Sequence, residues 1–142
     1  MDASQMTEAD AALLRARLHI RGCRRRFQRG MWADGIVSLY DALQHAMRWY
    51  VSLPEHRARL GMTGGEDLGD DRAVWRILVH GGVLDHSFDF DEFEALVGQA
   101  VGEGSFQCDA DAVMRQIEKA MTALEVMPFD EAALPREKPG AL

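Results

Sequence analysis

Seven arginines lie between residues 15 and 29, and guanidinium groups at this density could neutralise the phosphates of a nucleic acid. On a helix they spread over the whole polar half of the cylinder, which is typical of a solvated face whose long stems cover apolar neighbours. A third interpretation pairs the arginines with the acidic C-terminal half of this chain or of a second copy. The phosphate-binding alternative would centre on Arg17, Arg21, Arg24 and Arg25.

The net charge of −7 hides a division along the chain. Residues 11–60 carry ten basic and three acidic side chains, whereas residues 61–142 carry six basic and seventeen acidic ones. The chain is therefore electrically lopsided in sequence. The packing of the helices decides whether the molecule is also lopsided in space.

The composition predicts a single folded domain. A chain of 142 residues that is 47% hydrophobic and 27% charged can bury a core without disulfide or metal staples. No stretch approaches the roughly 20 apolar residues of a membrane span, and the acidic N-terminus does not resemble a signal peptide. We therefore expect a cytoplasmic protein without membrane contact, in which Cys23 and Cys108 are reduced thiols.

Other polar groups give weaker signals. Ser38, Asp41 and His45 share one helix face, as a hydrolase triad would need, but neighbours at this spacing commonly form surface pairs. The run HGGVLDHSFDFDEFE (80–94) matches neither an EF-hand nor an HExxH helix, and GGEDLGDD (64–71) lacks the basic residue of a phosphate loop. We expect no bound metal and no cofactor.

Apolar residues at helical spacing predict an all-α bundle of about five helices, built on an N-terminal antiparallel hairpin. The first helix is expected over about 8–29 with Thr7 as its N-cap. Gly30 begins the turn GMWADG into a second helix that ends before Pro54.

Three further helices are expected after the caps Asp70 or Asp71, Asp89 and Asp109. The first of these three should be central, because apolar residues occur nearly all round it. Residues 52–70 are expected to form a long connection with a short helical turn at 55–60. The domain is predicted over 1–128, with a flexible C-terminal tail over 129–142.

Three apolar side chains fall outside the predicted apolar stripes. Leu14 and Leu18 lie on the far side of the first helix, and Trp49 lies beside the stripe of the second. Apolar side chains left on a surface are typical of an interface. They predict contact with a second copy or with an unknown protein partner.

The stretch RRFQRGMWADGIVSLYDALQHAMRWYV (25–51) resembles the start of HEPN domains, small bacterial helical bundles, with their Tyr-x-Ala-x-x-x-Ala pattern at Tyr40, Ala42 and Ala46. The stretch VWRILVHGG (74–82) resembles the segment where ribonuclease members carry an arginine and a histidine, separated there by about four to six residues. Only three residues separate Arg76 from His80 here. The resemblance implies a dimerising domain that accompanies nucleotidyltransferases or RNA-directed systems, without activity of its own.

Cleavage of RNA without a metal needs a general base and a cation for the phosphate, and Arg76 and His80 lie one helical turn apart. A partly buried His80 at a helix C-terminus is the more common outcome. We therefore predict a non-catalytic, HEPN-like interaction module that binds a protein partner or forms a homodimer. The alternative is an RNA-directed protein, which binds through the arginine-rich helix or cleaves through a degenerate Arg/His motif.

Overall fold

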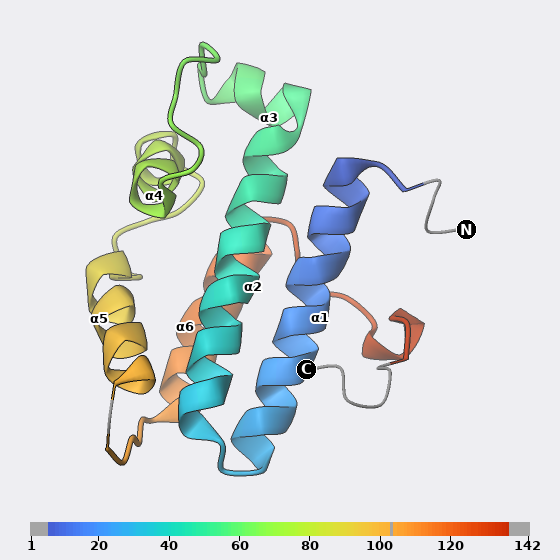
Figure 1. The fold of residues 1–142 in the computed structure, drawn as a ribbon. Coiled ribbons are helices and arrows are strands. Elements are labelled where there is room, and N and C mark those ends of the chain that lie inside the picture. Colours follow the sequence, from blue (N-terminus) through green and yellow to red (C-terminus); the bar gives the residue numbers. More distant parts are fainter. Residues whose placement is uncertain (1–5, 103, 137–142) are drawn as a thin grey trace.

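Two long antiparallel helices form the centre of the fold (Figure 1). α1 (Glu8–Gln28) begins at the predicted cap, where the hydroxyl of Thr7 accepts the backbone N–H of Asp10 at 3.0 Å. It ends at Gln28, and two residues later Gly30 turns the chain with a φ of +74°, a conformation that residues with a side chain rarely adopt. α2 (Trp32–Ser52) starts sooner than the sequence predicts, so the turn is shorter than GMWADG.

The computed structural model describes residues 6–102 and 104–136, and within them it contains six α-helices, one short 3-10 helix and no strand. After α2 come α3 (Pro54–Arg59), α4 (Asp71–His80), α5 (Phe90–Val101) and α6 (Ala110–Ala123). α3 matches the helical turn expected at 55–60. The predicted all-α bundle is confirmed.

α2 is the central helix, and it contacts each of the other five helices. Its sequence explains this role, because eleven of its residues are buried on more than one side of the helix. The prediction that the helix at 71–80 is central was wrong. Only Val74 and Leu78 of α4 are buried, and its other apolar side chains are half-buried at the edge of the bundle.

The hairpin packs tightly where α1 meets the start of α2. A Cβ atom on Gly35 would lie 2.4 Å from Cε1 of the Phe27 ring. Only glycine fits this position, because protein interiors are close-packed and leave no room for a methyl group here. Gly35 thus sets the distance between the two helices.

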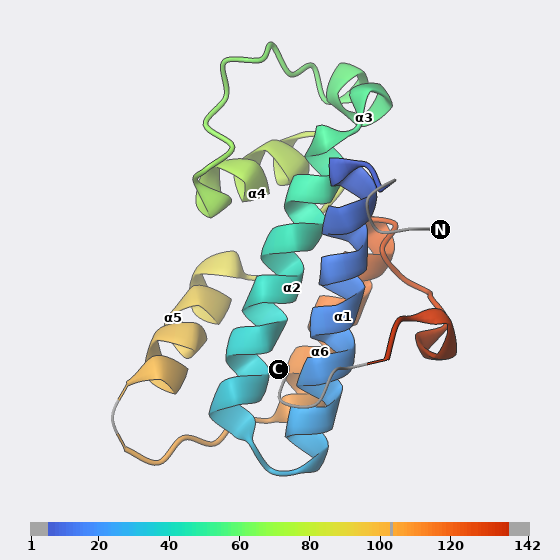
Figure 2. The same cartoon turned by 45° about the vertical axis from the view of Figure 1, so that its right-hand side comes forward.

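The chain after α6 runs back along the side of α1 that faces away from α2 (Figure 2). It includes the 3-10 helix η2 (Glu131–Ala133), and Phe129 is half-buried against the core. The tail predicted from residue 129 therefore includes a segment that packs on α1. The rest of that predicted tail, residues 137–142, lies outside the described residues.

Both cysteines are free thiols, as the sequence predicts. Cys23 is fully buried, and this burial raises the pKa of its thiol to about 12. Across residues 6–102 and 104–136, none of the helices combines the length and the apolar character that a bilayer span requires.

Candidate functional site

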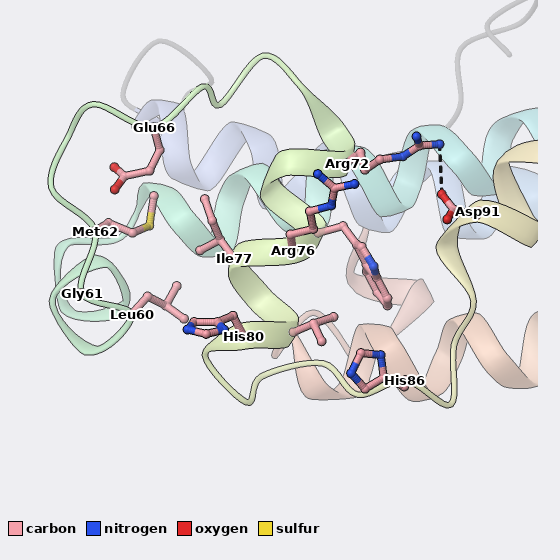
Figure 3. Close-up of a pocket in the computed structure, with 12 residues that line it drawn as sticks. Leu60, Gly61, Met62, Glu66, Arg72, Arg76, Ile77, His80, His86 and Asp91 are labelled. Carbon is pink, nitrogen blue, oxygen red and sulfur yellow. Dashed lines mark ion pairs between the residues drawn. The ribbon is translucent and has the colours of Figure 1, made fainter.

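An open groove of about 860 Å³ runs along the outer face of α4, with the end of α3 and the loop after it as its other wall (Figure 3). Its apolar lining consists of Leu60, Met62, Trp75, Ile77 and Val79. Its polar lining consists of Glu66, Arg72, Arg76, His80, His86 and Asp91. A groove of this size with a mixed lining fits a segment of another molecule.

The sequence of α4 creates a polar row on this face. Asp70 caps the helix, and its carboxylate accepts the backbone N–H groups of Arg72 and Ala73 at 3.0 and 3.3 Å. The buried face at Val74 and Leu78 fixes which side of α4 points into the bundle. Residues 72, 76 and 80 follow at intervals of four, so they line up on the opposite side, over the groove.

Asp71 anchors α4 to α2. Its carboxylate accepts hydrogen bonds from Tyr40 at 3.0 Å, Gln44 at 2.8 Å and Arg48 at 3.1 Å, and only 14% of its side chain is exposed. Burial of the Tyr40 phenol is the largest cause that raises its pKa, and the hydrogen bond to Asp71 is the second. The sequence analysis missed this network, although three α2 donors spaced four residues apart were a signal for it.

The basic side chains in the groove differ in whether they form ion pairs. Arg72 forms ion pairs with Asp91 at 2.9 Å and with Glu94. Among the described residues, Arg76 and His80 form no hydrogen bond or ion pair, and both are exposed. Arg76 therefore gives the groove a positive charge that no ion pair within the described part of the chain neutralises.

Glu66, the acidic residue that the loop after α3 contributes to the groove, is already hydrogen-bonded. The Glu66 carboxylate accepts the backbone N–H groups of Thr63 and Gly64, each at 2.9 Å, and these bonds lower its pKa to about 2. A carboxylate held by its own loop is a poor partner for Arg76 across the groove. The positive charge of Arg76 is left for a ligand.

Arg76 and His80 share the groove but do not converge. In Figure 3 the guanidinium of Arg76 points toward Arg72, whereas the ring of His80 lies beside Leu60. The expectation of a partly buried His80 was wrong, because its place on the outer face leaves it exposed. The ring of His86 lies apart from both in the same view (Figure 3).

Only two of the three residues predicted to contact a partner are partly exposed in the structure. Trp49 is only 9% exposed, because α3 folds back over it and its ring lies edge-on to Tyr50 and His56. Trp49 is therefore removed from that surface. Leu14 and Leu18 are half-buried on α1 and stand outside the apolar core.

The arginines of α1 are divided among different environments. Arg21 is buried with 5% exposure, which a solvated face did not predict. Arg24 forms ion pairs with Glu118 and Glu131, and Arg17 donates to the carbonyl of Val126 at 3.1 Å. Arg25 is exposed. The interpretation that pairs arginines with the acidic half of the same chain thus holds for Arg24.

The residues considered for a triad do not form one. Ser38 is buried at 8% exposure, and His45 stacks instead on His19 with ring centroids 5.3 Å apart. Burial lowers the pKa of both imidazoles. In the part of the chain that the structure describes, no three histidine, cysteine or acidic side chains gather as a metal ion would require.

Comparisons of the chain with protein-family models, with curated proteins and with solved structures give no match. The resemblance to HEPN domains stays a prediction.

Proposed function

We propose that this chain is a non-catalytic helical interaction module that binds an acidic, partly apolar segment of a partner protein in the groove along α4. The observation that carries the proposal is the guanidinium of Arg76, which has no ion-pair partner among the described residues and stands beside the half-buried apolar side chains of Trp75 and Ile77. Arginine and tryptophan are the residue types that most often dominate binding at protein interfaces.

The apolar and polar residues that line the groove suggest how a partner would be bound. The apolar lining removes hydrocarbon from water, while Arg76 attracts a carboxylate and fixes the register of the segment. The anchoring of α4 by Asp71 keeps this surface in place before binding, which reduces the entropy lost on association. The proposed partner is therefore recognised by alternating acidic and apolar side chains.

A second copy of the chain is the other candidate occupant, because residues 61–142 carry an excess of acids. This would make the module a homodimer, as a HEPN-like domain implies. The Tyr-x-Ala-x-x-x-Ala pattern at Tyr40, Ala42 and Ala46 is the sequence feature that supports this part of the proposal. Light scattering over a range of concentrations separates self-association from binding to another protein.

Anisotropy of a fluorescein-labelled peptide built of glutamate and leucine tests the groove directly. We expect Arg76→Ala to weaken binding about tenfold, which corresponds to about 1.4 kcal/mol. Arg115→Ala is the matched control, because Arg115 is an exposed arginine of α6 that does not line the groove. Equal affinity of Arg76→Ala and the wild type would overturn the proposal.

One observation favours the RNA-directed alternative. Arg76 and His80 are both exposed and both line one groove, so a phosphate bound to Arg76 would lie on the same face as an imidazole. Incubation with a labelled RNA tests it, since His80→Ala must abolish any cleavage that depends on this imidazole. Binding of RNA that is tighter than binding of the peptide, with a steep dependence on salt, would favour this alternative.

A further inference from the structure

The side of α1 away from α2 already binds a peptide segment, namely the C-terminal segment of the same chain. Arg17 and Arg24 are seven residues apart, so they lie on one face of the helix. Their guanidinium carbons lie 5.5 and 6.0 Å from the centre of the Phe129 ring, within the range of a cation–π contact. Arg24 also pairs with Glu131, two residues farther along.

Apart from these contacts and the partial burial of Phe129 against the core, the segment is weakly held. Residues 130–133 are exposed, and within the described part of the chain the backbone hydrogen bonds of residues 129–134 are local. They join Ala133 to Asp130 and Leu134 to Glu131. A segment with few buried contacts and no backbone bonds to its support opens at a low free-energy cost.

We propose that Arg17 and Arg24 form a docking site for an aromatic–acidic segment of a partner protein, and that residues 129–131 occupy this site as a ligand within the chain. The recognised chemistry is an aromatic ring followed two positions later by a carboxylate, in the order that Phe129 and Glu131 provide. The site lies on a different helix from the α4 groove and does not depend on the function proposed for that groove.

The geometry explains this selectivity. The aromatic ring lies against both guanidinium groups, and among the described residues the Glu131 carboxylate pairs only with Arg24, so the order of the two side chains is fixed along α1. Glu118 of α6 lies 3.3 Å from the other amino group of Arg24 and orients it. A segment with the reverse order would place its carboxylate away from Arg24.

The tethered segment is a competitor for any partner. Because Phe129 and Glu131 belong to the same chain as Arg17 and Arg24, they compete at an effective concentration on the order of millimolar. A partner segment of the same chemistry therefore binds the closed protein weakly. It binds strongly once Phe129 and Glu131 are removed, because the competition is lost.

The test uses the full-length chain and a labelled synthetic peptide of sequence FDEAAL, residues 129–134, in an anisotropy titration. We expect the double variant Phe129→Ala/Glu131→Ala to bind this peptide at least about tenfold more tightly than the wild type. Addition of Arg24→Gln should abolish the gain, and a peptide with the phenylalanine and glutamate exchanged should bind weakly. The gain should be the same in an Arg76→Ala background, which separates this site from the α4 groove.

Equal affinity of the wild type and the double variant would overturn the proposal, as would a gain that survives Arg24→Gln. A uridine oligonucleotide that binds the double variant more tightly than the peptide would assign the arginines to nucleic acid instead. A wild-type dimer that dissociates in the double variant would assign the site to a second copy. If circular dichroism shows the double variant to be unfolded, Phe129→Leu/Glu131→Gln provides the same comparison with a smaller change in packing.

Discussion

Replacement of Asp71 by alanine is expected to destabilise the protein by about 3 kcal/mol, because this carboxylate is the main polar link between α2 and α4. Three donors converge on it, from Tyr40, Gln44 and Arg48, at 2.8 to 3.1 Å. Only 14% of the Asp71 side chain is exposed, so in the folded alanine variant water can replace few of these hydrogen bonds.

The magnitude follows from the bonds that are lost. A hydrogen bond to a charged group contributes roughly 1.5–3 kcal/mol, and three bonds to one carboxylate are not additive. Arg48 is 41% exposed, so its guanidinium regains water in the variant and contributes least. Alanine improves helix propensity by about 0.5 kcal/mol, and the lost charge at the helix N-terminus costs a similar amount, so these two effects cancel.

Urea unfolding followed by far-ultraviolet circular dichroism measures the loss. The control is Asp70→Ala, which removes an exposed cap on the same helix and should cost about 1 kcal/mol. A double-mutant cycle with Arg48→Met gives the coupling between Asp71 and Arg48. If Asp71→Ala is no more destabilising than Asp70→Ala, or if the cycle shows no coupling, Asp71 does not anchor α4.

Two further predictions concern packing and pH. Gly35→Ala should destabilise the protein by about 1–3 kcal/mol because its Cβ would meet the Phe27 ring at 2.4 Å, whereas Gly98→Ala, with no atom near its Cβ, should stabilise α5 by roughly 0.5–1 kcal/mol. Thermal unfolding should move in opposite directions for the two variants, and a shift in the same direction would refute the packing interpretation. Burial holds the pKa of His19 and of His45 below the ordinary value of 6.5, so the unfolded chain binds more protons and stability is lost as pH falls through 6.5. His19→Gln/His45→Gln should therefore lose less stability than the wild type between about pH 7.5 and about pH 5.5, and equal losses would contradict the assignment.

Helix positions could be predicted from the sequence because their signals are local. Thr7, Asp89 and Asp109 each accept a backbone N–H three residues on, as the caps predicted. Gly30 adopts a positive φ in the turn just after α1, as predicted. Each of these features depends on neighbours within one helical turn, which the sequence contains in full.

The contacts of each face were harder to predict because they join distant residues. A helical projection places Trp49 beside the apolar stripe, but it does not predict that α3 covers it. Similarly, α1 shows an arginine-rich face, while one of the two acids that pair with Arg24 lies 107 residues away at Glu131. Periodicity fixes which side chains share a face, and only the packing of the helices fixes what that face meets.

The central claim, that the α4 groove binds an acidic segment, is tested most directly by backbone amide chemical shifts recorded while the glutamate–leucine peptide is added. The account predicts that the largest changes occur at residues 60–62 and 72–80, and that Arg76→Ala removes them. Changes confined to α1, or none at peptide concentrations that saturate the anisotropy signal, would contradict it.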